Sequence, residues 1–179
     1  MSGTIRLARP DDDAAAIAAI YAPFVSDSHV SFELAAPSEA EIRDRIRATL
    51  ELAPWLVHVT DSEVDGYAYA SAFKDRPGYR WSVETSVYVR GDRRRQGVAR
   101  RLMATLLDAL ARQGFHNAVA VIALPNDPSV ALFESLGFRR VALFQGIGFK
   151  LGAWWDVGMW QRELREKQAP PAEPTRPTV

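Results

Sequence analysis

The sequence predicts an α/β domain built on a mixed, mostly antiparallel sheet of six to seven strands with about four helices on its faces. Three observations lead to this prediction. Segments with the period of strands and segments with the period of helices follow one another in the order β-α-α-β-β-β-α-β-α-β-β. Two pairs of neighbouring strands are joined by short connections typical of hairpins. Two strand–helix–strand units predict crossovers, so parallel and antiparallel pairing occur in one sheet.

The first third of the chain predicts one strand and two helices. Residues 4–10 alternate apolar and polar side chains and end at a proline, which stops a strand. The acidic run at 11–13 favours the start of an Ala-rich helix, because negative charge is stabilised at the amino end of the helix dipole. Residues 26–33 form a polar connection. A second, amphipathic helix is expected over 38–52, where apolar residues recur every four positions.

Three strands are expected in the middle of the chain. Residues 55–60 and 66–73 are rich in β-branched and aromatic side chains, and the polar run 61–65 between them predicts a turn. Residues 74–80 contain proline, glycine and several charges and predict a loop. Residues 81–89 predict a strand whose valines share one face.

The last part of the chain alternates helices and strands. The period changes to that of a helix at Gly97, and Gly114 is a suitable end for it. Residues 117–124 are continuously apolar, as in a strand buried on both faces. A short helix is expected over 127–137, because a proline stands at its first turn and a glycine at its end. Residues 138–152 and 154–164 predict a closing pair of strands.

Composition limits the kinds of protein that this sequence can encode. The 179 residues suit one domain over residues 1–165, followed by a disordered Pro-rich tail over 166–179. Twenty-two basic and 22 acidic residues cancel, which argues against a general affinity for nucleic acid or membranes. No cysteine is present, so disulfides and zinc–thiolate sites are excluded, and no metal is expected. We expect a cytoplasmic location, because neither a signal-peptide core nor about 18 consecutive apolar residues occur.

The stretch VYVRGDRRRQGVARRLM, residues 87–103, carries six arginines around the point where a strand gives way to a helix. The first turn of a helix has backbone N–H groups without intrahelical partners, and the helix dipole adds positive charge there. Gly97 lets a phosphate approach the backbone closely, and arginines can add charge-assisted hydrogen bonds. Neither a Walker loop nor a dinucleotide fingerprint is present. The stretch therefore predicts an anion site.

Two motifs resemble those of the GNAT family of N-acetyltransferases. RRQGVA, beginning at Arg94, is similar to the family's pyrophosphate loop, and NDPSVALFESLGF, beginning at Asn126, is similar to the second half of its signature. The stretches IYAPFVSDSHVSFE, RPGYRWSVETSVYV and GFKLGAWWDVGMWQ look like the subgroup that acetylates phosphinothricin, methionine sulfone and methionine sulfoximine. The resemblance implies transfer of acetyl from acetyl-CoA to the amine of a small amino acid or analogue by direct attack.

The resemblance also implies where acetyl-CoA binds. The sheet would be splayed beyond the middle of the strand 81–89, and the pantetheine arm would pair with the open strand edge. Backbone N–H groups of the arginine–glycine turn would hold the pyrophosphate. The residues that the resemblance assigns to the cofactor are Val87, Tyr88, Val89, Arg94, Arg95, Gln96, Gly97, Val98, Ala99, Arg100, Asn126, Ser129 and Ser135.

Catalysis requires a proton acceptor for the attacking ammonium. With no cysteine and three histidines, a carboxylate or a water chain is the expected acceptor, and the resemblance assigns the role to Glu84. We expect burial to raise the pKa of Glu84, or water to relay the proton. The resemblance makes the N–H of Val89 the donor to the thioester oxygen. Many relatives use a tyrosine late in the second motif as the general acid that protonates the leaving CoA thiolate. This chain has Phe133 and Phe138 in the equivalent region, so its general acid stays open.

The candidate substrate residues are Phe32, Glu33, Tyr79, Arg80 and Thr85. Arg80 could bind a carboxylate with two hydrogen bonds, and Phe32 with Tyr79 could form a wall for the side chain. The subgroup has histidine at the position of Phe133, so which substrate is used stays open. The subgroup is commonly dimeric, and we expect a homodimer.

Two alternatives to this function stay open. A GNAT enzyme could acetylate another amine, such as a polyamine, an aminoglycoside or a protein N-terminus. The basic loop 74–80 argues against a polyamine, because a polycation needs an acidic lining. The chain could also be a non-catalytic acetyl-CoA-binding module, which would bind CoA without turnover. Nucleic-acid binding is disfavoured by the zero net charge.

Overall fold

The computed structural model describes residues 3–177 as a seven-stranded sheet covered on both faces by helices. The strands are β1 (Thr4–Leu7), β2 (Trp55–Thr60), β3 (Glu63–Ala72), β4 (Ser82–Val89), β5 (Asn117–Leu124), β6 (Arg139–Lys150) and β7 (Ala153–Glu163). The helices are α1 (Pro10–Ser26), α2 (Glu39–Leu50), α3 (Val98–Gln113) and α4 (Asp127–Ser135), with short 3₁₀ turns at Pro77–Tyr79 and Gly91–Arg93. The predicted fold class and order of elements are confirmed.

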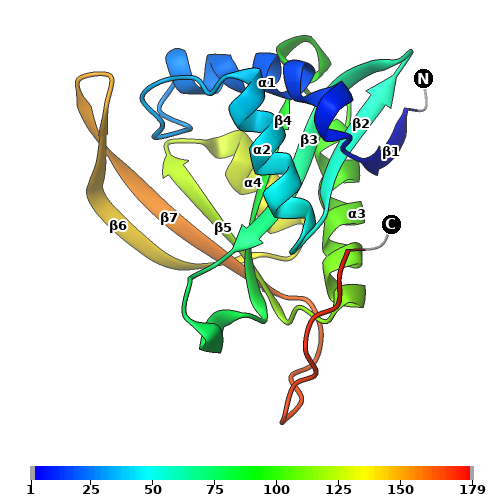
Figure 1. The fold of residues 1–179 in the computed structure, drawn as a ribbon. Coiled ribbons are helices and arrows are strands. Elements are labelled where there is room, and N and C mark those ends of the chain that lie inside the picture. Colours follow the sequence, from blue (N-terminus) through cyan, green and yellow to red (C-terminus); the bar gives the residue numbers. More distant parts are fainter. Residues whose placement is uncertain (1–2, 178–179) are drawn as a thin grey trace.

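The strands lie in the order β1-β2-β3-β4-β5-β7-β6. Only β4 and β5 pair in parallel within residues 3–177, and every other pair is antiparallel. Figure 1 shows α1 and α2 in front of the sheet and α3 and α4 behind it. Each face has its own apolar core, one packed under α1 and α2 and the other under α3 and α4. The β6–β7 hairpin extends to the left beyond both layers, so β6 is an edge strand.

Local signals set the ends of the helices. Ser38 caps α2, because its hydroxyl accepts from the N–H of Glu41 and the Glu41 carboxylate accepts from the N–H of Ser38. At α1 the acidic residues 11–13 lie in the first turn, as expected, and the Asp13 carboxylate accepts from the N–H of the N-cap residue Arg9 at 2.6 Å. The helix begins at Pro10, and Asp13 is buried, where it accepts hydrogen bonds from the Arg6 guanidinium at 2.7 and 2.8 Å. That carboxylate therefore joins β1 to α1.

The turn between β2 and β3 is shorter than the predicted 61–65. β3 begins at Glu63, so Asp61 and Ser62 alone form the turn, and both have positive φ, at 50° and 68°. Two such residues match the twist of a two-residue hairpin. The sequence did not reveal the tight turn because neither position is glycine or asparagine. β5 differs from expectation at one residue, Val121, which is 42% exposed where the sheet opens.

The C-terminal segment runs back along α3 (Figure 1). It forms no helix or strand between Lys167 and Pro177, yet the indole N–H of Trp81 donates to the Ala172 carbonyl at 2.8 Å. The N–H of Thr175 donates to the Gln113 carbonyl at 2.7 Å. These contacts were not foreseen from the composition; disorder of residues 166–179 stays a prediction, and residues 178–179 lie outside the described range. No helix in residues 3–177 is long and apolar enough to cross a membrane.

Candidate active site

The parallel strands β4 and β5 part half-way along β4 and leave one edge of that strand open. Their pairing stops at Glu84 opposite Val119, whereas β3 stays paired with β4 as far as Val89 opposite Gly66. The hydroxyl of Thr85 donates to the Val119 carbonyl at 3.2 Å, just where the strands part. The rest of β4 therefore has a backbone edge available to an extended ligand. This confirms the predicted splay.

A groove of about 530 Å³ opens beside this gap, between β4, residues 92–97 (the phosphate loop) and the start of α4. The candidate cofactor residues that line it are Val87, Tyr88, Val89, Arg94, Arg95, Gly97, Val98, Ala99, Arg100, Asn126 and Ser129. Two candidates do not line it. The Gln96 side chain donates to the Asp92 carbonyl at 3.1 Å, and the Ser135 hydroxyl accepts from Arg100 at 2.8 Å. The Ser135 side chain therefore holds Arg100, which lines the groove, and the Gln96 side chain makes a contact within the phosphate loop.

The phosphate loop has the backbone of an anion site. Gly97 is the N-cap of α3 with φ of +79°, and Arg95 also has positive φ, at 61°. This conformation exposes the first N–H groups of a 16-residue helix toward the groove end, where the helix dipole favours negative charge. Arg94 lies over the ring of Phe24 at 5.1 Å, which holds its guanidinium against α1.

The start of α4 forms the opposite wall. The side chain of Asn126 caps this helix by accepting from the N–H of Ser129 at 3.3 Å, and both residues line the groove. Capping and groove lining are therefore combined in one side chain. Phe133, on the same helix, is buried and packs edge-on against Phe138 at 5.1 Å between ring centres. Both rings belong to the core under α3 and α4.

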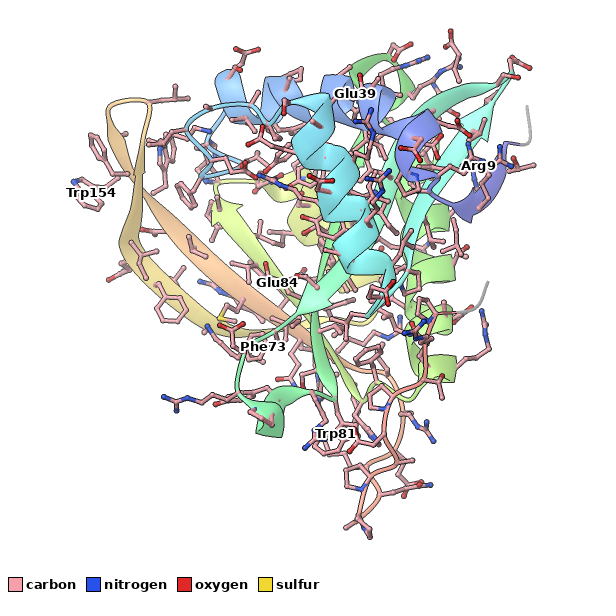
Figure 2. All side chains as sticks on the ribbon, in the orientation of Figure 1. Arg9, Glu39, Phe73, Trp81, Glu84 and Trp154 are labelled. Carbon is pink, nitrogen blue, oxygen red and sulfur yellow. The ribbon has the colours of Figure 1, made fainter. Side chains whose placement is uncertain are left out.

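Glu84 lies at the branch point of the sheet, on the face that α1 and α2 cover (Figure 2). β4 has no bulge, so Glu84 alternates with Val83 and Thr85, which point toward α3. Burial raises the pKa of Glu84, and the nearby positive charge of Lys74 opposes this only in part. The direction agrees with the expectation from the sequence. A carboxylate with a raised pKa is a better proton acceptor than an exposed one.

Two of the substrate candidates lie in the segment between α1 and α2. Phe32 packs against β6 so closely that a side chain at Gly148 would collide with its ring. Glu33 accepts from Arg45 at 2.7 and 2.9 Å and from the Tyr21 hydroxyl at 2.9 Å. Arg45 lowers the pKa of Glu33 most, while burial raises the pKa of Tyr21 to about 12. Glu33 is therefore an ion-pair partner in this structure.

The other three candidates lie on different elements. Tyr79 is in the 3₁₀ turn after β3 and packs edge-on against Phe73, with the ring centres 5.9 Å apart. Arg80 donates to the carboxylate of Glu173 in the C-terminal segment at 2.8 Å and lies over the Trp81 ring. Thr85 is buried. The structure does not bring these side chains together with Phe32 around one cavity.

A buried lysine that sequence reasoning missed fixes the segment carrying Phe32. The ammonium of Lys150, on β6, donates to the carbonyls of Val25 and Ser31, each at 2.5 Å. Its side chain is almost fully buried, which lowers the pKa of Lys150. A lysine in an edge strand normally predicts a solvent contact, and nothing in the local sequence marks this one as buried. Arg93, Phe24 and Val30 also line the groove without having been predicted.

Lys150→Met is expected to lower the free energy of unfolding by about 3 kcal/mol, because two buried carbonyls lose a charged donor. Urea denaturation monitored by tryptophan fluorescence measures the change. Lys167→Met, which removes a largely exposed lysine paired with Glu163, is the control and should stay within about 0.5 kcal/mol of wild type. Equal effects of the two substitutions would contradict the bracing role of Lys150.

A sheet that opens between two parallel strands, with the start of a helix beside the opening, is the architecture of an acetyltransferase. A family model described as an acetyltransferase (GNAT) domain matches residues 5–160, and the chain belongs to this family. The chain is 41% identical over 167 residues to phosphinothricin N-acetyltransferase of Streptomyces viridochromogenes, covering 93% of this chain and 90% of that one.

Two further relatives have the same chemistry in their names. L-methionine sulfoximine/L-methionine sulfone acetyltransferase of Salmonella typhimurium is 38% identical over 66% of this chain and 70% of its own length. A phosphinothricin acetyltransferase of Sinorhizobium meliloti, solved in complex with acetyl-CoA, superposes with a TM-score of 0.90 at 36% identity, covering 98% of this chain and 94% of that chain. Residues 3–177 contain no cluster of side chains suited to a metal ion.

Proposed function

We propose that this N-acetyltransferase transfers the acetyl group of acetyl-CoA to the amine of a small amino acid or analogue of the phosphinothricin, methionine sulfone or methionine sulfoximine type. The observation that carries the proposal is the groove at the open edge of β4, which has a phosphate loop at one end and the half-buried Glu84 near the other. The names of the relatives support the substrate class.

The residues of the groove fit acetyl-CoA. The cofactor's two amides match the unpaired edge of β4 at Val87 and Val89, which offers backbone donors and acceptors. Its pyrophosphate matches the N–H groups after Gly97 and the guanidinium groups of the phosphate loop. In addition to these polar groups, the groove is lined by the apolar side chains of Val30 and Leu132.

The proposed reaction divides between two groups of the chain. Acetyl-CoA supplies, when bound, the thioester carbonyl that the amine attacks. Glu84 takes the proton from the substrate ammonium, directly or through water, because burial makes its carboxylate more basic. The N–H of Val89 would donate a hydrogen bond to the thioester oxygen as that atom gains negative charge. As the C–N bond forms, the C–S bond of the thioester would break, and the coenzyme A thiolate would leave and take up the second proton that the nitrogen loses.

The substrate residues stay predictions. Phe32, Glu33, Tyr79, Arg80 and Thr85 are the candidates, and the amino acid would enter on the Glu84 side of the sheet. Glu33 and Arg80 could contact it only by exchanging a present partner, Arg45 or Glu173, for the ligand. A cytoplasmic location also stays a prediction, which cell fractionation tests.

Release of free thiol from acetyl-CoA tests the function. Phosphinothricin, methionine sulfone, methionine sulfoximine and spermidine serve as parallel acceptors. Turnover with the amino acid analogues and little with spermidine is expected. Preference for spermidine would favour another amine class, and CoA binding without any turnover would favour a non-catalytic module.

The homodimer is proposed on the basis of an apolar surface on the β6–β7 hairpin. Trp154 projects away from the body at this hairpin (Figure 2). The exposed apolar side chains there, which we call the hairpin patch, are Val141, Leu143, Phe144, Ile147, Phe149, Leu151 and Trp154. A long apolar edge strand invites pairing with another chain. A second copy would cover this patch.

Ile147→Asp is expected to convert the dimer into a monomer, because it puts a charge in the middle of the hairpin patch. Light scattering coupled to size-exclusion chromatography measures the mass. Leu34→Asp alters an exposed leucine that the hairpin patch does not include and should leave the dimer intact. A monomeric wild-type protein would refute the proposal.

A further inference from the structure

A buried polar cluster lies behind the phosphate loop, on the side away from the cofactor groove. Asp65 on β3 accepts from Nδ1 of His58 at 2.9 Å and from the Thr60 hydroxyl at 2.6 Å. The side chains of His58 and Asp65 are each 2% exposed. Neither residue has a role in the proposed reaction. Burying a carboxylate–imidazole pair costs free energy unless both groups have polar partners. The contacts of this pair therefore indicate what it does.

A β-bulge brings the two residues together. His58 pairs with Gly66 and Val59 pairs with Val64, so Asp65 is an extra residue in β3. Simple alternation from Tyr67 would put Asp65 on the face of α1 and α2. The bulge turns it to the α3 face, where the phosphate loop lies.

The cluster reaches the phosphate loop through Arg101. A guanidinium can only donate, and one of its nitrogens, Nη2, lies 3.1 Å from Nε2 of His58. His58 therefore carries its proton on Nδ1 and accepts at Nε2, which gives the chain Arg101 to His58 to Asp65. The other terminal nitrogen of Arg101 donates to the Gln96 carbonyl at 3.3 Å.

Two further links bind the start of the loop. Nε of Arg93 lies 3.1 Å from Oδ1 of Asp65, and the Arg90 N–H donates to the Asp65 carbonyl at 2.9 Å. A cavity of about 180 Å³ lies between the cluster and the loop. Arg93 and Val98 line both this cavity and the cofactor groove, so the loop is the wall between the two.

The bond to the Gln96 carbonyl sets the direction of the next amide. A trans peptide is planar, with its C=O and N–H on opposite sides. Holding the carbonyl of Gln96 toward Arg101 therefore directs the N–H of Gly97 away from the cluster, to the groove side. That N–H is one of the groups expected to meet the pyrophosphate.

We propose that His58 and Asp65 are positioning residues, which hold the phosphate loop from behind through Arg101 and Arg93 in the conformation that binds the cofactor. The inference rests on the proposed acetyl-CoA site. The affinity for acetyl-CoA then depends on the side chains of His58 and Asp65, which do not line the cofactor groove, whereas the affinity for the amine does not depend on them.

Asp65→Asn gives the first test, because a purely electrostatic role and a positioning role of Asp65 predict opposite changes in the affinity for acetyl-CoA. If Asp65 acted only through its charge, its removal from behind the loop would strengthen binding of an anionic cofactor. If it positions the loop through Arg93, binding weakens, by about tenfold for the loss of one partly buried ion pair. Titration calorimetry with acetyl-CoA measures Kd. Asp61→Asn removes a carboxylate from the exposed turn of the same hairpin and is the matched control.

Two substitutions at His58 test the link to Arg101. An asparagine amide reaches about as far as Nδ1 of histidine and can donate to Asp65, whereas a glutamine oxygen reaches about as far as Nε2 and can accept from Arg101. His58→Asn is expected to raise the KM for acetyl-CoA about tenfold, and His58→Gln by less than about threefold, with kcat and the KM for the amine unchanged.

The outcomes separate this inference from the proposed function. Wild-type protein that fails to bind acetyl-CoA would refute the proposed function. Wild-type binding together with tighter binding by Asp65→Asn, or with equal KM values for the two His58 substitutions, would overturn the positioning role. If the His58 variants do not fold, the sign of the Asp65→Asn effect still decides, because that substitution keeps the acceptor for Nδ1.

Discussion

Glu84→Gln is expected to lower kcat for acetyl transfer by roughly 10²–10⁴-fold, the usual contribution of a positioned general base. Glutamine has nearly the same shape but cannot take a proton from the substrate ammonium. Glu84 lines no part of the cofactor groove, so Kd for acetyl-CoA should not change. Thiol release with methionine sulfone measures kcat, and calorimetry measures Kd.

Two companion variants sharpen this test. Glu166→Gln removes an exposed carboxylate after β7 and should leave kcat at the wild-type value. Glu84→Asp draws the carboxylate back by one methylene, which disables direct proton transfer more than transfer through a water chain. A Glu84→Gln variant that retains a third of the wild-type kcat would rule out Glu84 as the base.

The burial of Glu84 couples activity to stability through pH. Because burial raises the pKa of Glu84 in the folded state, the folded protein binds this proton more tightly than the unfolded chain does. Protonation of Glu84 therefore stabilises the folded state. This stabilisation is complete below the pKa of Glu84 in the unfolded chain, about 4.3, and is lost as pH rises through the pKa of Glu84 in the folded protein. Activity should rise over the same pH interval. Glu84→Gln should therefore raise Tm at neutral pH and lose this advantage at pH 4.

The elements that the sequence predicts well are those specified locally. The phosphate loop is an example, because a glycine at a strand-to-helix junction and the period of α3 both lie within one short stretch. The capping pair Ser38 and Glu41 and the glycines around α3 act over a few residues, so the helix ends follow from their order.

Contacts between residues that are far apart in the chain could not be predicted from the sequence. Lys150 finds its acceptors about 120 residues away, and the bulge at Asp65 reverses the face that alternation predicts. Arg80 was expected to bind substrate, but a carboxylate from the C-terminal segment is paired with it in this structure. Such partners depend on tertiary packing, because one side chain offers the same chemistry to any group that the fold brings near it.

Gly97→Ala is expected to raise Kd for acetyl-CoA by roughly 5–30-fold. Gly97 has φ of +79°, and a Cβ in this left-handed conformation costs about 1–2 kcal/mol. The added carbon would also lie 3.3 Å from a terminal nitrogen of Arg101, the residue that holds the Gln96 carbonyl. The loop would relieve the strain by turning its backbone N–H groups away from the groove. Because binding of acetyl-CoA would have to restore the strained conformation, the affinity would fall by the same amount, about 1–2 kcal/mol.

Gly91→Ala is the matched control, because it adds the same methyl group just before the phosphate loop. Gly91 is not among the glycines with positive φ, and a Cβ there would meet no atom within 4 Å. Its Kd should equal that of wild type, since neither strain nor collision arises. Calorimetry on the three proteins measures the comparison. Equal losses in both variants would mean that binding depends on loop flexibility in general, whereas a loss confined to Gly97→Ala would tie the affinity to the backbone conformation at the start of α3.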